Sequence, residues 1–519
     1  MSHLARTACA ALASLAVLLL AAASPAGAIV PLGQFGEGPG DQAGLLGPAL
    51  GVAIDPAGRV YVSELDRISV FSPRGAFLRA FGKDVVPGNA STRFEQCTTV
   101  CQDGEPGGDS GALDGAAGIA TDSEGLLYVA EAANARISVF NQQGAFVRAF
   151  GEEGTAGGEL RNPQSVTIDD DVLWVPDPAN ARVSLYTREG TFLRAFGKRV
   201  NRALGGRTDR CSSRCGPGVA TGDAGALLGP LSVALDAAGN VYVSELLNRR
   251  VSVFSPDLAF LRAFGSDVVP GNAQTGFEVC TTATGCKAGT TGAVFAPGNG
   301  PQPVVNGPGV LNQPGGVAIG PDAALYVTEA VNRRVSVFSP GPSFLRAFGK
   351  NVVPGNTGTG FEQCTTRCTG GAAGAGPGEM TNPELLAFDC RGALYVAEDA
   401  NGRVERFGEP GTPNPPCVQP AALRKPFGIM RVRADARTGT ARLTISVPWS
   451  CELRLRGRVV RTAVKQVEFR GRTRLVVRPR GAAKRRLHRT GRARVRVKVT
   501  YWPWGGKRRT KTVAVVLRR

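Results

Sequence analysis

The sequence predicts an all-β protein in which a six-bladed β-propeller, closed by its N-terminal strand, is followed by a small β-sandwich. Three observations lead to this prediction. A unit of four short apolar segments recurs six times, a copy of its fourth segment precedes the first unit, and an arginine-rich alternating pattern follows the sixth. A small antiparallel sheet with two apolar faces is unstable alone, and repeated sheets of this kind bury their faces by packing around an axis.

The repeat unit is clearest from Gly316 to Gly349. Its apolar segments are GVAI, ALYVTE, RRVSVF and SFLRAFG. Turn-forming clusters rich in Gly, Pro, Asn and Asp separate them, so each copy predicts four antiparallel strands. The other copies begin at Gly51, Gly118, Ser165, Ser232 and Leu385.

The sixth copy is incomplete. After RVERFG, from Arg403 to Gly408, no FLRAFG segment follows, whereas a matching IVPLGQFG runs from Ile29 to Gly36 ahead of the first copy. We therefore expect the N-terminal strand to complete the last blade. This closes the ring and removes an open sheet edge that would otherwise promote aggregation.

The motif order within each repeat matches a known family. An acidic residue ends the first turn, YVxE follows, and N-x-R then stands before a branched apolar residue. This pattern resembles the NHL repeat over residues 29–411, which implies a six-bladed propeller but no particular ligand. The extracellular NHL propellers of bacterial receptor kinases look like ligand- or protein-binding sensors, and only the binding part of that analogy applies here.

The first residues predict export. Residues 1–28 contain a basic start (Arg6), an apolar run and a small-residue site at Ala26-Gly27-Ala28, as in a secretory signal peptide. We expect a secreted or envelope-associated monomer without a transmembrane segment. The predicted domains are the propeller at 29–411, a Pro-rich linker at 412–428 and a basic β-sandwich at 429–519.

Charge is divided unevenly along the chain. The 519 residues include 61 Lys and Arg and 42 Asp and Glu, a net charge of +19. From Arg424 onward there are 30 basic residues and 3 acidic ones, so the preceding part is net negative. Because a negative propeller does not attract phosphates, we do not expect it to bind nucleic acid.

Four long links between repeats each contain a close cysteine pair. The pairs are Cys97/Cys101, Cys211/Cys215, Cys280/Cys286 and Cys364/Cys368. In an exported chain such pairs predict disulfides that fix the shape of the loops. Either Cys390 pairs with Cys417 and leaves Cys451 free, or Cys417 pairs with Cys451. A metal site built from several pairs is the alternative, but the mature chain has one histidine, His488, in the basic region, and we expect no metal or cofactor.

An acid after each YVx segment and an arginine opening each third strand recur in every copy. These residues are Glu64, Glu131, Asp177, Glu245, Glu329 and Glu398, with Arg67, Arg136, Arg182, Arg250, Arg334 and Arg403. We interpret them as structural ion pairs and turn locks, because a functional site is rarely repeated identically in all repeats. A ring of acids holding a cation is the alternative. The first-turn acids have the same interpretation, with Gly320 interrupting the series Asp55, Asp122, Asp169, Asp236 and Asp389.

These features favour a non-enzymatic binding protein. The propeller contains no histidine and no recognisable nucleophile and base, so we assign no catalytic residues. The links that carry the cysteines and the loops between second and third strands should share one face, where they would recognise an extracellular protein or glycan. The alternative is a propeller lyase or hydrolase with a carboxylate site in its channel.

The basic region alternates apolar residues with Arg or Thr, which predicts six or seven antiparallel strands. It loosely resembles the immunoglobulin-like end modules of exported actinobacterial proteins. The residues expected on its outer face are Arg454, Arg456, Arg458, Arg492, Arg494, Arg496 and Lys498. They favour attachment to an acidic cell-wall polymer or another anionic surface, with solubility alone as the alternative.

Overall fold

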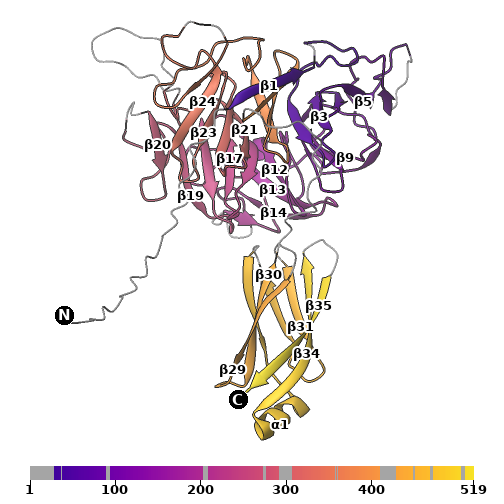
Figure 1. The fold of residues 1–519 in the computed structure, drawn as a ribbon, viewed down its shortest axis with the longest axis vertical. Coiled ribbons are helices and arrows are strands. Elements are labelled where there is room, and N and C mark those ends of the chain that lie inside the picture. The colour runs from indigo at the N-terminus through magenta and orange to yellow at the C-terminus, as the bar shows by residue number, and fades with distance from the viewer. Residues whose placement is uncertain are drawn as a thin grey trace, which may run out of the picture.

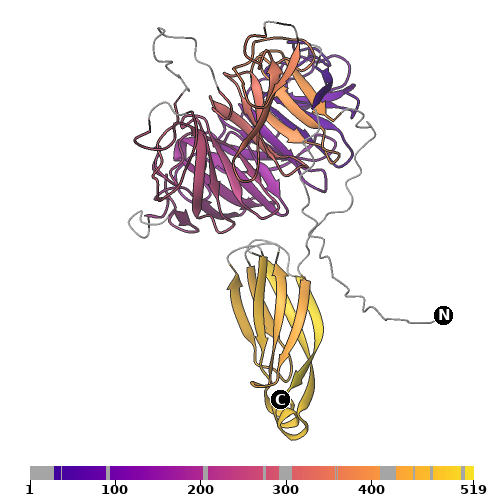
Figure 2. The same cartoon turned by 60° about the vertical axis from the view of Figure 1, so that its left-hand side comes forward.

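The computed structural model describes most of the chain between residues 29 and 519 (Figure 1). The described ranges are 29–36, 38–88, 94–202, 209–272, 276–290, 307–356, 358, 360–409, 428–447, 451–467, 471–503 and 509–519. The predicted signal peptide, Cys417 and nearly all of the predicted linker lie outside these ranges. Figures 1 and 2 show a ring of sheets and, in orange and yellow, the C-terminal strands as a second body.

The ring consists of six antiparallel sheets, each starting with one strand at the central channel. Blade 1 contains β2 (Gly51–Ile54), β3 (Val60–Glu64), β4 (Arg67–Phe71), β5 (Phe77–Lys83) and β6 (Phe94–Cys97). Blade 2 contains β7 (Ala116–Thr121), β8 (Leu127–Glu131), β9 (Arg136–Phe140) and β10 (Phe146–Phe150). Blade 3 contains β11 (Thr167–Asp169), β12 (Val172–Asp177), the 3-10 turn η1 (Pro178–Asn180), β13 (Arg182–Thr187), β14 (Phe192–Phe196) and β15 (Arg210–Cys211).

The second half of the ring repeats this plan. Blade 4 contains β16 (Pro230–Leu235), β17 (Val241–Glu245), β18 (Arg250–Phe254), β19 (Phe260–Ser266) and β20 (Phe277–Cys280). Blade 5 contains β21 (Pro314–Ile319), β22 (Leu325–Glu329), β23 (Arg334–Phe338), β24 (Phe344–Lys350) and β25 (Phe361–Cys364). Blade 6 contains β26 (Pro383–Phe388), β27 (Leu394–Glu398), β28 (Arg403–Gly408) and, as its outer strand, β1 (Val30–Phe35).

The N-terminal strand closes the ring, as predicted. β1 pairs antiparallel with β28, with Val30 opposite Gly408 and Phe35 opposite Val404, and a bulge between Pro31 and Gly33. The bulge allows the chain to bend while the rest of the register continues. The last blade therefore combines segments from the two ends of the propeller region.

One aromatic pair joins each blade to the next. The second Phe of each FLRAF or FVRAF segment, or Phe35 in blade 6, packs against an aromatic residue at or next to the end of the third strand of the following blade. The ring centroids are 5.1 Å apart for Phe81–Phe140, 5.3 Å for Phe150–Tyr186, 4.9 Å for Phe196–Phe254, 5.1 Å for Phe264–Phe338, 5.1 Å for Phe348–Phe407 and 5.0 Å for Phe35–Phe71. Phe35 comes from β1, so the closing strand also supplies the sixth of these contacts.

Four blades carry a fifth strand that we did not predict. The cysteine-bearing links were expected as loops, but FEQC, FEVC and their equivalents form β6, β15, β20 and β25 on the outer edge of the fourth strand. In every case the first cysteine lies opposite the alanine of FLRAF, as Cys97 lies opposite Ala80. The small alanine side chain leaves room for the disulfide, which is buried with Val85 in a minor core.

The C-terminal region is a β-sandwich of two antiparallel sheets. The three-stranded sheet has the order β29 (Gly428–Asp435), β30 (Thr440–Val447), β33 (Gly471–Val477). The four-stranded sheet has the order β32 (Ala463–Val467), β31 (Cys451–Arg456), β34 (Arg492–Pro503), β35 (Arg509–Arg518), and α1 (Gly481–Thr490) precedes β34. Val495, Val497 and Val499 of β34 are buried in the core while the residues between them are exposed, which follows from the two-residue period of a strand. Within the described ranges, no helix has the length and apolar character needed to cross a membrane.

Candidate functional site

The predicted acid–arginine pairs lie at one end of every blade, in the connection between the second and third strands. We call the propeller surface formed by these six connections the corner face. The N···O distances are 2.8 Å for Arg67–Glu64, 3.0 Å for Arg136–Glu131, 3.1 Å for Arg182–Asp177, 2.9 Å for Arg250–Glu245, 2.9 Å for Arg334–Glu329 and 3.2 Å for Arg403–Glu398. The carboxylates are buried, and each is held by an arginine of its own blade.

The arginines also hold the links between blades. Arg334 donates hydrogen bonds to the carbonyl oxygen of Val310 (2.8 Å), in the link that enters its blade, and to that of Thr369 (2.8 Å), just after the second cysteine of the link that leaves it. Arg250 and Arg182 make the same kind of contacts in their blades. In blades 1, 3, 4 and 5 the guanidinium group therefore joins two links to one blade corner, whereas Arg136 and Arg403 bind the backbone of the entering link. Among the described residues, no group of acids, histidines and cysteines is arranged to hold a metal ion.

The first-turn acids belong to the opposite face of the propeller, because consecutive turns of an antiparallel sheet lie at opposite ends. Asp55 Oδ1 accepts hydrogen bonds from the backbone N–H groups of Ala57 and Arg59 (both 2.9 Å), and Asp122 and Asp389 bind their own turns in the same way. They are turn caps rather than members of the corner pairs.

In the fifth repeat a different residue replaces the missing first-turn acid. Gly320 occupies that position, where a Cβ atom would lie 2.6 Å from the Tyr326 ring. Two residues later, Asp322 accepts hydrogen bonds from the Ala324 N–H and the Tyr326 hydroxyl (both 3.1 Å). The cap is thus retained from a shifted position, which the repeat alignment did not reveal.

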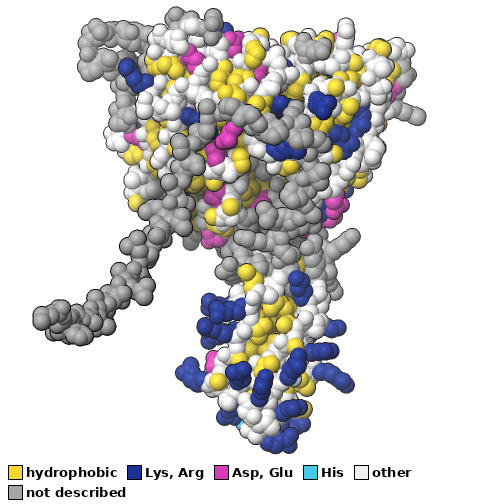
Figure 3. Space-filling model, in the orientation of Figure 1, with side chains coloured by type: hydrophobic (Ala, Val, Ile, Leu, Met, Phe, Trp, Pro, Cys, Tyr) yellow, Lys and Arg dark blue, Asp and Glu magenta, His cyan; other side chains and the backbone are white. Residues whose placement is uncertain are grey.

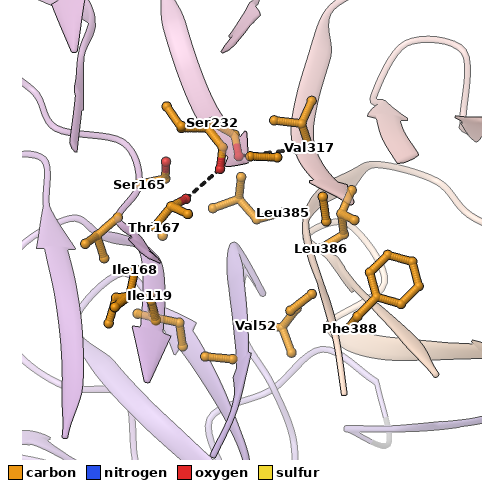
Figure 4. Close-up of a pocket in the computed structure, with 18 of the residues that line it drawn as sticks. Val52, Ile119, Ser165, Thr167, Ile168, Ser232, Val317, Leu385, Leu386 and Phe388 are labelled. Carbon is orange, nitrogen blue, oxygen red and sulfur yellow. Dashed lines mark hydrogen bonds between the residues drawn. The ribbon is translucent and has the colours of Figure 1, made fainter. Parts of the chain in front are cut away.

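The side chains that line the central channel are mostly apolar. Its cavity of about 350 Å³ is lined by the first strands of all six blades, with Val52, Ile119, Val317 and Leu385 among the lining residues (Figure 4). Its hydroxyl groups bind backbone, as when Thr167 Oγ1 donates to the Val233 carbonyl oxygen at 2.6 Å.

Asp169 of the third repeat is the one titratable residue among the described channel-lining residues. The predicted first-turn acid of that repeat thus lies beside the channel.

Blade 6 departs from the other repeats in two acidic residues that sequence reasoning missed. Glu384 occupies a position that is Leu, Ala, Gln, Leu or Gly in the other repeats, directly before the channel-lining Leu385. The side-chain amide of Asn382 donates to Glu384 (2.9 Å) and to Asp399 (3.1 Å). Burial, together with the charge of Asp399, raises the pKa of Glu384 to about 7.

The second acid, Glu405, stands on β28 where the other repeats have serine. The equivalent residues are Ser69, Ser138, Ser184, Ser252 and Ser336. In blade 5 this serine hydroxyl donates to the corner acid Glu329. In blade 6 both Glu398 and Glu405 lie against Arg403, at 3.2 and 3.0 Å. Burial raises the pKa of Glu398 to about 7 and that of Glu405 to about 8, and Arg403 offsets only part of this. The signal available in the sequence was that both positions carry an acidic residue only in the sixth repeat.

The four close cysteine pairs are disulfides. Their Cα atoms are 5.5, 5.4, 5.3 and 5.4 Å apart, in the order Cys97–Cys101, Cys211–Cys215, Cys280–Cys286 and Cys364–Cys368. Cys390 is also disulfide-bonded, whereas its expected partner Cys417 lies outside the described residues, and the Cys451 side chain is not described either. The disulfides hold the fifth strands in place. The links that carry them therefore form a rigid rim of the propeller and not free loops.

Exposed apolar side chains lie on the corner face. Leu65, Leu247 and Val331 follow the corner acids of blades 1, 4 and 5, and their exposed fractions are 42%, 57% and 44%. They are carried by corners that the buried arginines hold in place. Leu247 and Val331 occupy equivalent positions in the neighbouring blades 4 and 5.

The predicted basic residues lie mainly on the outer face of the four-stranded sheet of the sandwich. Arg492, Arg494, Arg496 and Lys498 alternate along β34, and Arg456 of β31 is directly opposite Lys498. Arg454 is half-exposed on β31, and Arg458 is exposed just after that strand. Figure 3 shows Lys and Arg side chains along the visible face of the sandwich, whereas the visible propeller surface is mixed.

No known family model and no curated protein matches the sequence. Among solved structures, the chain is similar to virginiamycin B lyase from Staphylococcus aureus (12% identity, covering 69% of this chain and 94% of the lyase, TM-score 0.35). It is also similar to the WD40 β-propeller domain of Doa1 (11%, 74% and 98%, TM-score 0.36) and to a protein of unknown function from Bacteroides thetaiotaomicron (11%, 73% and 75%, TM-score 0.41). The chain is an all-β protein with a closed six-bladed propeller followed by a β-sandwich.

Proposed function

We propose that this is a secreted, non-enzymatic binding protein whose corner face recognises an extracellular protein or glycan. In this proposal the repeats are of the NHL type, and residues 1–28 direct export. The sandwich is an immunoglobulin-like module that attaches to an acidic envelope surface. The observation that carries the proposal is the presence of three exposed apolar residues, Leu65, Leu247 and Val331, on corners fixed by buried ion pairs. Such side chains favour a protein partner over a glycan, because apolar burial drives most protein association.

Two matched double variants of the full chain test the recognition role. Leu247→Asp with Val331→Asp places charge on the corner face. Leu261→Asp with Leu345→Asp makes the same change at exposed positions of the fourth strands, where the exposed fractions are 39% and 37%. Labelled protein is titrated onto intact cells and cell extracts. We expect at least a tenfold loss of affinity for the first variant and little change for the second. Equal binding by both variants and the unchanged protein would contradict the proposal.

The rival function is a propeller enzyme with a carboxylate site. The cluster of Glu384, Asn382 and Asp399 favours it, since a carboxyl with a pKa of about 7 beside a channel suits a general acid or base. A screen of lyase and hydrolase substrates tests this rival. An activity that follows an ionisation near pH 7 and disappears in Glu384→Gln would support the rival and contradict the binding proposal.

A further inference from the structure

A second basic feature of the sandwich is a cavity, separate from the outer face of β34. We call it the cationic pocket. It has a volume of about 650 Å³ and is lined by the β29–β30 turn, the end of β33, the β31–β32 connection and α1. Six Lys and Arg side chains line it: Arg437, Arg442, Arg461, Arg478, Lys484 and Arg519.

The pocket contains little opposing charge. Asp435 is the one acidic side chain among its described lining residues, and it is already engaged. Thr438 donates its backbone N–H to Oδ1 at 3.2 Å, and Arg442 lies 3.9 Å from Oδ2. Hydrogen bonds from the side chain and the backbone of Thr438, with Arg442 nearby, lower the pKa of Asp435. One acidic side chain faces six basic ones, so the pocket has a positive potential that attracts anions.

Regular structure holds these cations near one another. The Arg461 N–H donates to the Arg478 carbonyl oxygen at 2.9 Å, which fixes the two backbones side by side. Lys484 and His488 are one turn apart on the same side of α1. The Arg519 guanidinium lies 2.9 Å from His488 Nε2. The backbone positions of the basic groups are therefore set before any ligand binds.

The arrangement is suited to phosphate. Arginine binds phosphate oxygens through paired N–H donors, and several cations around one cavity suit an anion whose charges are close together. At about 30 Å³ for each water molecule, a cavity of this size has room for about twenty waters and therefore for more than one phosphate group. Carboxylates spaced along a polymer place fewer charges in the same volume. We propose that the cationic pocket binds phosphate groups of a polyanionic chain, a ligand class that narrows, and rests on, the envelope attachment proposed for the sandwich.

The test compares two triple variants of the full mature chain with equal charge changes. Arg461→Ala, Arg478→Ala and Lys484→Ala alter the pocket, whereas Arg494→Ala, Arg496→Ala and Lys498→Ala alter the outer face of β34. All six side chains are exposed, and melting temperatures check that the variants fold. Calorimetric titration with tripolyphosphate in 0.15 M NaCl should give saturable binding, at least tenfold weaker in the pocket variant and within about twofold of the unchanged protein in the other. Poly-glutamate, titrated in parallel, should bind more weakly than tripolyphosphate.

Three results would overturn the inference: no saturable binding of tripolyphosphate, equal losses in the two variants, or equally tight binding of poly-glutamate. Retention of the same proteins on cell-wall preparations separates this inference from the proposed attachment. Retention lost only in the outer-face variant contradicts the pocket and leaves attachment intact. Tripolyphosphate binding without retention of any protein supports the pocket and contradicts envelope attachment.

Discussion

Replacing Glu405 by serine should make the propeller less sensitive to alkaline pH. Glu405 lies on β28, the strand that pairs with the closing strand, and its side chain is fully buried against Arg403. Glu398 shares that arginine. One guanidinium thus faces two carboxyl groups, and the low dielectric of the interior penalises ionising both. Glu405→Ser installs the residue that the other five repeats use.

The size of the effect follows from the two pKa values. Burial raises the pKa of Glu405 to about 8, whereas its ordinary value is 4.5. The folded state therefore retains a proton that the unfolded chain releases. The stabilising contribution is complete below about pH 4.5 and is lost as the pH rises through about 8. Each pH unit in that window costs about 1.4 kcal/mol per group, so the loss by pH 8 is on the order of 3 to 5 kcal/mol.

Calorimetric unfolding of the full chain at pH 5, 6, 7 and 8 measures this loss. The melting temperature of the unchanged propeller should fall steadily as the pH rises. The fall should be smaller in Glu405→Ser because the ionisation of Glu405 is removed, and a part should remain because Glu384 and Glu398 keep their raised pKa values. Glu124→Ser, at a carboxylate that is 67% exposed, provides the matched control and should behave like the unchanged chain. Identical pH profiles for Glu405→Ser and Glu124→Ser would refute the reasoning.

Three further predictions concern closure, the rim and the turn cap. Phe35→Ala should lower the free energy of unfolding by about 2–4 kcal/mol and speed hydrogen exchange in β28, whereas Phe77→Ala, which loses a contact within blade 1, should leave exchange in β28 slow. Equal exchange rates in β28 would contradict the role of the closing strand. Cys97→Ser with Cys101→Ser opens a small ring and should cost at most about 2 kcal/mol, with faster exchange confined to β6; global unfolding would contradict this. Asp322→Ala should cost about 1 kcal/mol by denaturant titration, and Asp322→Asn, which keeps an acceptor oxygen, should cost less.

The repeat pattern was sufficient to predict the ring. Alternating apolar segments and turn residues are local signals, and six copies of one unit require six equivalent sheets. The missing FLRAFG segment after Gly408 and the matching segment at Ile29 predicted the closing strand, which pairs with β28 as expected. The predicted outward-facing arginines of β34 are likewise exposed, because side-chain direction alternates strictly along a strand.

The fifth strands were missed because each of them forms only where a neighbouring strand offers a free edge for pairing. A segment such as FEQC is too short to indicate a strand by itself, and it forms β6 because β5 presents an open edge and a small residue, Ala80. The shifted turn cap at Asp322 was missed for a similar reason: the space beside Tyr326 decides which nearby residue can serve.

The sequence alone therefore determined the number of blades, the strand at which the ring closes, the disulfide-prone links and the separation of an acidic propeller from a basic sandwich. These depend on the order of residues along the chain. Only the tertiary structure decided which charges share one environment. It brought Glu398 and Glu405 to one arginine and six basic side chains from separate segments to one pocket. Electrostatic energy depends on distance and burial in space, and neither quantity is encoded in the spacing of residues along a strand.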